Sequence, residues 1–249
     1  MKNNLKKLAL WITNDNIITA IFFVIIIWMS IASGFWKTEV YHIPVGLIGT
    51  VTGAISWVAT RTIQQKKNVG NWISLVTNLL SSVVSFFLGD YSRIFGSLPN
   101  LILTALCTKT WYGKKRVKIG DDKKHFYLAL IIASVLEIIM ATAAFTIFGL
   151  LLHKINSFYE LFNLQHGISW IFFLAIIRTI TSYVAYLSQI FNTWHAQAGW
   201  AFYSLISLIQ NIFLKNVPSI VKDIGYLFTA AASVVSWRAD TADKKSSKA

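Results

Sequence analysis

Long apolar runs separated by short charged segments fill most of the chain. The first run extends from Ile17 to Trp36, behind a basic leader at residues 1–16. Each run approaches the roughly 20 residues that a helix needs to cross the hydrocarbon core of a bilayer. The pattern therefore predicts an all-α protein with eight membrane-spanning helices, the later ones at about 44–61, 70–88, 92–112, 126–152, 167–190, 197–215 and 218–237.

The N-terminal run has an alternative interpretation, because a cleaved signal peptide also begins with a basic segment followed by an apolar one. The run from Ile17 to Trp36 is long enough to span, however, and it lacks a convincing small-x-small cleavage motif. We therefore expect a helix that the mature protein retains.

Composition supports the membrane interpretation. The chain has 249 residues, of which 55% are hydrophobic and only 13% charged, with a mean hydropathy of +0.56. A soluble domain of this size carries about 25% charged residues. The expected surroundings are thus a lipid bilayer, and the short loops leave no room for a separate soluble domain.

The net charge of +13 would also suit a nucleic-acid-binding protein. The basic residues, however, gather in the leader, the 61–70 loop, the 113–124 loop and the C-terminal tail, which alternate in the eight-helix plan. The opposite side carries fewer, and acidic residues partly offset them. Because Lys and Arg concentrate on the cytoplasmic side of membrane proteins, we expect both termini in the cytoplasm and no nucleic-acid partner.

Signals for catalysis or cofactor binding are missing from the sequence. The lone Cys107 allows neither an intrachain disulfide nor a cysteine metal cluster, and the five histidines are scattered. Nucleophile-elbow, zinc-protease, Walker and dinucleotide-binding motifs are missing as well. We therefore expect a protein that is not an enzyme and that uses no cofactor or metal.

Two parts of the chain resemble each other at a constant offset of 126 residues. The pattern Phe87-Leu88-x-Asp90-x-x-x-Ile94 with a later Trp111 matches Phe213-Leu214-x-Asn216-x-x-x-Ile220 with a later Trp237. Upstream, Gly70-Asn71-Trp72 resembles Ala198-Gly199-Trp200 after a slip of two residues. The copies begin four helices apart, so both cross the membrane in the same direction.

This repeat predicts two three-helix bundles joined by a linker helix. The expected units are a basic leader and N-terminal helix at 1–43, a first repeat at 44–112, a basic loop and linker helix at 113–153, a second repeat at 154–238 and a charged cytoplasmic tail at 239–249. Transporters are often built from such repeats, with the substrate held near the midplane where the repeats meet.

The stretch from Gln189 to Gln210 is nearly free of charge but rich in polar and aromatic residues. Trp200, Tyr203 and Ser207 follow an i, i+3, i+7 spacing and so share one face of a helix. Such a face gains nothing by pointing at lipid, whereas in a cavity between helices it would hold a small, flat, polar molecule. Gln189, at the end of the preceding helix, is expected to join this site.

Aromatic residues have a second common place in membrane proteins, the belt at the bilayer surface. Trp200, near a helix start, could serve there, but Tyr203 and Ser207 continue its face inward, which favours the cavity. The belt is the role expected of Trp111, Trp170 and Trp237.

The first repeat holds a second polar stripe, formed by Asn71, Trp72, Asn78, Ser81, Ser82 and Ser85. Small polar residues often serve only to pack helices together. Asn78 is the strongest ligand candidate, because an amide offers both donors and acceptors to a heterocycle. Trp72 and Asn100 complete the candidate substrate-binding set. Asn100 follows Pro99 at an expected helix kink, and kinks point to binding sites.

Two ionisable residues lie inside apolar runs, where a charge is costly. Glu137 could carry a proton or bind substrate, or it could be a structural carboxylate bonded to a neighbouring helix. Its place in the linker helix favours the structural role. Arg178 either pairs with Glu137 or extends to the membrane surface, and both alternatives stay open.

The sequence resembles the PnuC-type vitamin and nucleoside-precursor transporters over about residues 44–238. The likeness rests on Asn71-Trp72 with Asn78, on Trp111-Tyr112-Gly113, and on Gln189 eleven residues before Trp200. The family pattern Trp-x-x-Trp followed by Asn or Asp reads here Trp200-x-x-Tyr203 followed by Ile206-Ser207. The aromatic pair is kept, and the amide or acid is missing.

The resemblance implies a 3+1+3 helix arrangement similar to the SWEET sugar transporters, and facilitated diffusion across the inner (cytoplasmic) membrane of a bacterium. It implies nicotinamide riboside as the first substrate, trapped by a separate cytoplasmic kinase, with thiamine, riboflavin or a deoxynucleoside as alternatives. It also implies a homotrimer. Apart from the resemblance, three other functions stay open for this sequence. They are a membrane enzyme that uses Glu137 or Asp90 as an acid, an ion-coupled symporter, and a non-transporting scaffold or immunity protein.

Overall fold

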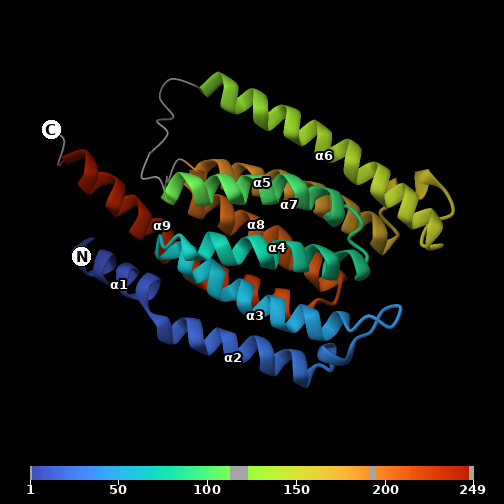
Figure 1. Ribbon diagram of the computed structural model, residues 1–249, viewed down its shortest axis with the longest axis horizontal. Helices are drawn as coiled ribbons and strands as arrows, with labels where there is room; N and C mark the ends of the chain where they lie inside the picture. Colours follow the sequence, from blue (N-terminus) through green and yellow to red (C-terminus); the bar gives the residue numbers. More distant parts are fainter. Residues whose placement is uncertain (1, 113–122, 191–194, 247–249) are drawn as a thin grey trace.

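A computed structural model describes residues 2–112, 123–190 and 195–246, and its regular elements in these ranges are helices (Figure 1). The N-terminal helices α1 (Lys2–Asn14) and α2 (Asn16–Ala32) meet at a bend of 50°. The other long helices are α3 (Val45–Gln64), α4 (Val69–Phe87), α5 (Arg93–Tyr112), α6 (Lys123–Leu151), α7 (Gly167–Ile190), α8 (His195–Phe213) and α9 (Val217–Ser246). Short 3-10 helices precede α3 and α7, namely η1 (Phe35–Lys37) and η3 (Phe158–Phe162).

The expected all-α fold is confirmed, and helices α2 to α9 lie at the predicted positions. Two helix ends differ from the prediction by more than three residues. Helix α2 stops at Ala32 rather than Trp36, because Gly34 takes a left-handed conformation (φ 74°) that turns the chain. Helix α9 continues past Trp237 to Ser246, since no Gly or Pro interrupts it there.

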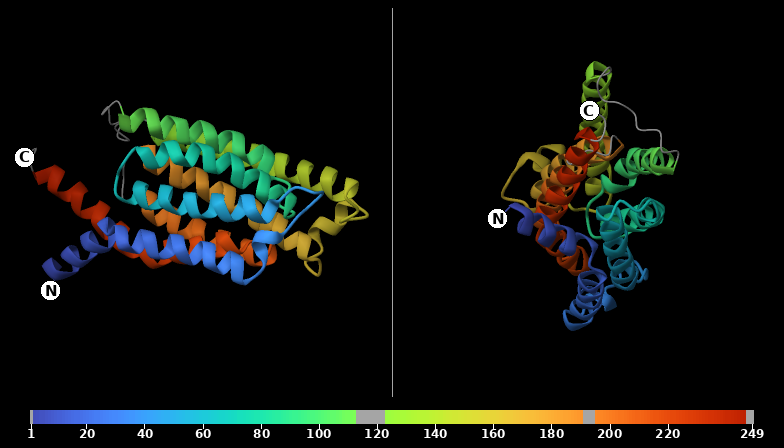
Figure 2. Two further views of the ribbon diagram at one scale, coloured as in Figure 1. Left: turned by 60° about the horizontal axis from the view of Figure 1, so that its bottom comes forward. Right: turned by 90° about the vertical axis from the view of Figure 1, so that its left-hand side faces the viewer.

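Six helices form a closed ring. Helix α3 packs on α4, α4 on α5, α5 on α7, α7 on α8, α8 on α9, and α9 back on α3. Helices α2 and α6 lie outside this ring on opposite sides, α2 against α3 and α9, and α6 against α5 and α7 (Figures 1 and 2). The ring encloses a central space to which all six helices contribute side chains.

The order of contacts in the first half of the ring recurs in the second half. Helices α3, α4 and α5 pack in succession as α7, α8 and α9 do. Helix α4 (Val69–Phe87) and helix α8 (His195–Phe213) begin and end 126 residues apart, which is the offset of the sequence repeat. The position of α2 against α3 and α9 corresponds to that of α6 against α7 and α5. The N-terminal helix, left outside the expected repeats, thus has a counterpart in the linker helix.

The outer surface is apolar and the inside of the ring is polar, which is the reverse of a soluble protein. On α4, the side chains of Trp72, Val76 and Leu79 are 58%, 62% and 53% exposed, whereas those of Asn71 and Ser82 are buried. In water such an exposed apolar surface would aggregate, and in lipid it is the stable arrangement. These are the properties of a multi-pass membrane protein.

Fewer helices pass a test of length and hydropathy for membrane spanning than pack together in the ring and beside it. Within the described residues, α4, α7 and the Leu130–Leu151 part of α6 are each long and apolar enough to cross a membrane, and the bent pair α1–α2 is a fourth candidate. Helices α3, α5, α8 and α9 fall short of the same test while contributing polar side chains to the inside of the ring. Their polar residues are shielded from lipid, so a low mean hydropathy does not prevent spanning.

Apolar contacts attach the two outer helices to the ring. Phe145 of α6 is buried among Tyr91, Phe172 and Leu161 of η3, all in one cluster. On the opposite side Ile26 of α2 packs with Trp57 of α3 and with α9, and the Trp57 Nε1 donates a 2.9 Å hydrogen bond to the carbonyl of Thr19. Both outer helices are thereby fixed to the ring.

Arg61 has a structural role that the sequence analysis missed. It was counted as a charge of the 61–70 loop, but it lies within α3 and is only 1% exposed. Its Nη2 donates hydrogen bonds to the carbonyls of Ile12, Thr13 and Asp15 at the α1–α2 bend, at 2.7, 3.1 and 3.2 Å. These carbonyls end a helix, where a cation is favoured, so Arg61 holds the bend in place.

The expected aromatic belt is only partly found. Trp237 is fully buried and its Nε1 donates a 2.9 Å hydrogen bond to the carbonyl of Gln64, so its assignment to the belt was wrong. Trp170 is 43% exposed on the outer surface, as a belt residue would be. The side chain of Trp111, the basic loop at 113–122 and the last residues of the tail at 247–249 lie outside the described part of the chain.

Candidate functional site

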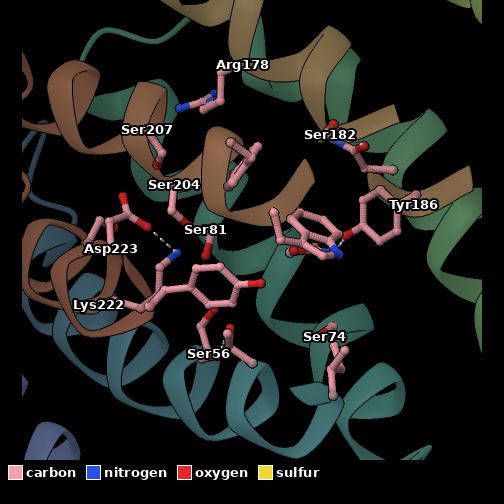
Figure 3. A pocket seen from close by; sticks show the side chains of 18 of the residues that line it. Ser56, Ser74, Ser81, Arg178, Ser182, Tyr186, Ser204, Ser207, Lys222 and Asp223 are labelled. Atoms are coloured by element: carbon pink, nitrogen blue, oxygen red, sulfur yellow. Dashed lines mark hydrogen bonds and ion pairs between the residues drawn. The ribbon is translucent and has the colours of Figure 1, made fainter. Parts of the chain in front are cut away.

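A polar cavity lies at the centre of the ring. The volume open to the centres of water molecules is about 100 Å³, which is room for several waters. Side chains from α3, α4, α5, α7, α8 and α9 line the cavity, and most of them carry hydroxyl, amide or charged groups (Figure 3). In a membrane protein such groups are placed inside only where they bind one another, water or a ligand.

Residues 126 positions apart supply most of the lining. The two residues of each pair come from corresponding helices, α3 and α7, α4 and α8, or α5 and α9. The pairs are Ser56 and Ser182, Thr60 and Tyr186, Asn71 and Gln197, Ser74 and Trp200, Asn78 and Ser204, Ser81 and Ser207, Ser85 and Asn211, Arg93 and Ser219, and Asn100 and Tyr226. The cavity therefore lies where the two halves of the ring face each other.

Small side chains keep the centre of the cavity open. Ser56 from α3, Ser74 and Ser81 from α4, and Ser204 from α8 point toward a common space in Figure 3. A serine at each position provides a hydroxyl donor and acceptor without filling the space. The result is a polar chamber rather than a packed helix interface.

One wall of the cavity is aromatic. The ring of Trp200 lies 4.7 Å from that of Tyr186 and 5.3 Å from that of Tyr203, centroid to centroid, both in edge-to-face arrangement. The matching positions in the first half are Ser74 for Trp200 and Thr60 for Tyr186. Only one half of the ring therefore offers aromatic surface, so a flat ligand would meet unlike walls on its two sides.

Gln189 positions Trp200 from behind the cavity wall. Its Oε1 accepts a 2.7 Å hydrogen bond from Nε1 of Trp200, and its Nε2 donates a 2.8 Å bond to Oδ1 of Asn71. Gln189 is fully buried and does not line the cavity. The sequence analysis expected Gln189 to bond the substrate directly, and the structure instead places it between α8 and α4.

The predicted amides Asn78 and Asn100 both line the cavity. Asn78 donates hydrogen bonds of 2.9 Å to the hydroxyl of Tyr186 and 3.3 Å to that of Thr104. Asn100 accepts a 3.0 Å bond from the hydroxyl of Ser182. Helix α5 continues through Pro99, so Asn100 remains within a helix. Each amide links two different helices at the edge of the chamber.

Trp72 lies outside the site. It is 58% exposed on the outer face of α4 and does not line the cavity, whereas its neighbour Asn71 is buried and does. Successive residues of a helix point about 100° apart, so only one of the two can face inward. The two-residue slip in the sequence comparison had paired Trp72 with Trp200. The helix ends show that Ser74 is the residue at the matching position.

Ser207, the last residue of the predicted face, begins a polar chain along α8 and α9. Its hydroxyl accepts a 3.0 Å hydrogen bond from Nδ2 of Asn211, which also donates a 3.1 Å bond to Oδ2 of Asp223. The other oxygen of Asp223 lies 3.6 Å from Nζ of Lys222 (Figure 3). All four residues line the cavity.

Arg178 pairs with Asp90, and neither alternative expected from the sequence was right. Nη2 of Arg178 lies 2.5 Å from Oδ2 of Asp90, and both side chains are buried. Nη1 of Arg178 also donates to the side chain of Gln210. The ion pair joins α7 to the α4–α5 loop, and the Gln210 bond joins α7 to α8.

Glu137 has a different partner. Its Oε2 accepts a 3.0 Å hydrogen bond from the hydroxyl of Tyr183, and the pair connects α6 to α7. Gly96 of α5 gives the carboxyl group room, because a Cβ at that position would lie 3.2 Å from Oε1. Glu137 does not line the cavity.

Three charged cavity residues escaped the sequence analysis, namely Arg93, Lys222 and Asp223. They stand near the starts of α5 and α9 and were counted only among the charges of the side opposite the basic loops. In the structure they line the cavity. A hydropathy pattern gives no signal for this, because it does not say which way a charged residue near a helix end points.

Comparison with known proteins finds a solved structure with a similar fold. No family model and no curated protein matches the sequence. One solved structure does match the fold, and it is described as the crystal structure of the vitamin B3 transporter PnuC. The match covers 88% of this chain and 89% of that chain, with a TM-score of 0.54 and a sequence identity of 15%.

This chain has the fold of a PnuC transporter. The resemblance drawn from the residues is thereby confirmed at the level of the fold. The likeness spans nearly the whole of both chains and thus more than a single three-helix bundle. In the described part of the chain, no group of three or more His, Cys, Asp or Glu side chains is placed to hold a metal ion.

Proposed function

We propose that this protein is a membrane transporter for a water-soluble vitamin or nucleoside. The observation that carries the proposal is a polar cavity with one aromatic wall, enclosed by a helix ring whose outer surface is apolar. Such a cavity is a stable place for a polar molecule inside a bilayer. The likeness in fold to a vitamin B3 transporter supports the same class of function.

In the proposed binding mode a heterocycle stacks on the aromatic wall. Trp200 contacts its face, and Tyr203, whose ring is edge-to-face with the indole, contacts its rim. Asn78, Asn100 and Ser207 bond its polar edge, because all five residues line the same chamber. Gln189 acts on the ligand only through Trp200, by fixing the indole with the 2.7 Å bond. The mode uses stacking for affinity and hydrogen bonds for orientation.

We further propose that the two halves of the ring are the repeats 44–112 and 154–238, with the helix at 113–153 between them. Their recurring contacts and the paired lining residues support this division. Parallel repeats that meet at a substrate site can rock against each other and open the site to either side in turn. Facilitated diffusion then needs no nucleotide, and a cytoplasmic kinase would trap the substrate.

The proposed orientation places both termini in the cytoplasm of a bacterial cell. The ends of α1 and α9 lie at the same end of the molecule in Figure 1, and both segments are rich in lysine. The basic segments elsewhere in the alternate loops support the same side. A homotrimer is carried over from the resemblance as part of this proposal.

The substrate identity follows first from the resemblance, which puts nicotinamide riboside ahead of thiamine, riboflavin and deoxynucleosides. Each has a heterocycle that could stack on Trp200 and polar groups that could bond the serine and amide side chains. The test is a binding panel of these compounds on the purified protein, measured by calorimetry or by thermal shift.

Trp200→Ala is the variant that decides the site. We expect it to weaken binding of whichever compound binds by at least about fivefold, since stacking on an aromatic ring contributes roughly 1 kcal/mol or more. Trp72→Ala is the matched control, because Trp72 is an exposed tryptophan of the first repeat outside the cavity. Equal effects of the two variants would refute the assignment, and a panel without any binder would favour a non-transporting scaffold.

A further inference from the structure

The cavity holds more positive than negative charge. Three cationic side chains line it, Arg93, Arg178 and Lys222, with Asp223 as the anionic one. Asp90 lies beside the cavity and pairs with Arg178 at 2.5 Å, while Asp223 pairs with Lys222 at 3.6 Å. Two ion pairs are thus complete, and the third cation, Arg93, is left over.

The carboxylate whose charge acts on Arg93, Asp90, is already paired with Arg178. Nη2 of Arg93 donates a 3.3 Å hydrogen bond to the hydroxyl oxygen of Tyr203. Within the described part of the chain Arg93 forms no ion pair, and its buried Nε has no hydrogen-bond partner. A guanidinium inside a membrane protein is costly unless an anion or several acceptors compensate its charge.

The residues around Arg93 also indicate a site for an anion. Arg178, a side chain only 2% exposed, also lines the cavity, and its Nε has no hydrogen-bond partner among the described residues. The matching position to Arg93 in the second half is Ser219, so the surplus charge belongs to one half only. Tyr203 connects Arg93 to Trp200, whose ring lies 5.3 Å from that of Tyr203. The unpaired cation therefore stands beside the aromatic wall.

We propose that Arg93 forms an anion subsite, and that the ligand of this cavity is a heteroaromatic ring carrying a carboxylate. The ring stacks on Trp200 with Tyr203 at its edge, and the guanidinium of Arg93 binds the carboxylate, a match of planar donors to planar acceptors. The inference rests on the proposed transport function and narrows its substrate. It disfavours ligands with a fixed positive charge, which include nicotinamide riboside and thiamine.

Two pairs of probes isolate the charge of the ligand. Nicotinate and nicotinamide share one ring and differ in a carboxylate against a neutral amide, and nicotinate riboside and nicotinamide riboside differ in the same way. Binding to the purified full-length protein is measured by calorimetry for all four compounds. We expect the carboxylate member of each pair to bind at least about tenfold more tightly, as a charge-assisted bidentate contact would give.

Variants at Arg93 assign the preference to this residue. Arg93→Met should remove the preference for the carboxylate, and Arg93→Lys, which keeps the charge, should retain part of it. Raising the salt concentration should weaken nicotinate more than nicotinamide. If Arg93→Met does not fold, the wild-type ratio, its salt dependence and the Arg93→Lys variant still decide the matter.

Equal or tighter binding of the amide members would overturn the anion subsite, as would a carboxylate preference that survives in Arg93→Met. The proposed function has a separate test in a neutral deoxynucleoside such as thymidine. Binding of thymidine that depends on Trp200, without any carboxylate preference, would leave the transporter standing and remove the subsite. A protein that binds none of these compounds would lose both.

Discussion

Trp200 shows how a single side chain obtains its function from residues far away in the sequence. Its indole N–H is held by Gln189, which is held in turn by Asn71 of the first half of the ring. An unsupported indole on a cavity wall would sample several rotamers. Restricting it to one rotamer when a ligand binds would then cost conformational entropy. The buried amides remove that freedom in advance.

Removing this support gives a prediction at the residue scale. Gln189→Leu keeps the volume of the side chain but leaves the Trp200 N–H and the Asn71 carbonyl oxygen without their partner, at about 1–3 kcal/mol for each group left unsatisfied. We expect a lower midpoint of thermal unfolding in detergent and weaker ligand binding. A variant that binds as tightly as wild type would show that the indole needs no support from Gln189.

The pair of Arg178 and Asp90 carries a second residue-scale prediction. Arg178→Met should destabilise the protein by about 3–5 kcal/mol, because it leaves Asp90 buried without its ion-pair partner and with only the Ser92 hydroxyl as a side-chain donor among the described residues. Adding Asp90→Asn should recover part of the loss, since the unpaired charge is gone. Unfolding midpoints of the single and double variants measure this. Additive losses would mean that the two residues are not coupled.

At the scale of the elements, the main question is what the outer helix α6 does. Most of its surface is apolar and exposed, and its polar link to the ring is the bond between Glu137 and Tyr183. Because Glu137 does not reach the cavity, the structure favours the structural role that its place in the linker helix suggested. A proton-coupling role would require it to meet the substrate path.

The corresponding prediction separates these two roles. Glu137→Gln keeps a hydrogen-bond acceptor for Tyr183 and removes the charge, so we expect uptake of a binding compound within about twofold of wild type and with unchanged pH dependence. Uptake is measured in proteoliposomes, with membrane levels as the control. Loss of uptake in a well-folded Glu137→Gln variant would instead assign proton coupling to this carboxyl group.

Glycine at one helix crossing shows how closely the elements approach. Gly53 of α3 lies against Pro218 of α9, and a Cβ on Gly53 would come within 2.7 Å of the proline Cβ. This contact closes the ring between its first and last helices. Small residues at such crossings are typical of membrane helices, which pack by close backbone approach.

At the scale of the whole molecule, the two halves of the ring share one helix arrangement but line the cavity with different side chains. Helix contacts and lining positions recur after 126 residues, yet Trp200 and Tyr186 stand opposite Ser74 and Thr60. The scaffold places both sets of residues around one cavity. The differences between the sets then give a bound molecule one preferred orientation.

The bilayer explains why the helix positions and part of the candidate site could be predicted from the sequence. Spans α2 to α9 were predicted at their observed positions, because a membrane helix must hide every backbone polar group and is therefore long, continuous and apolar. Trp200, Tyr203 and Ser207 were also placed on one inward face, since polar side chains within an apolar run have few other places to go. Both inferences need only local sequence and the helix period.

What the sequence alone did not determine depends on which helices are neighbours. Arg178 found Asp90 and not Glu137, Gln189 lies behind the cavity wall, and Trp72 faces outward, where a shift of one residue turns a side chain by about 100°. Arg93 and Lys222 counted only as charges near helix ends, and the structure places them at the cavity. Hydropathy thus decides which segments are helices, whereas ring closure, which brings together residues about 100 positions apart, decides which side chains share the site.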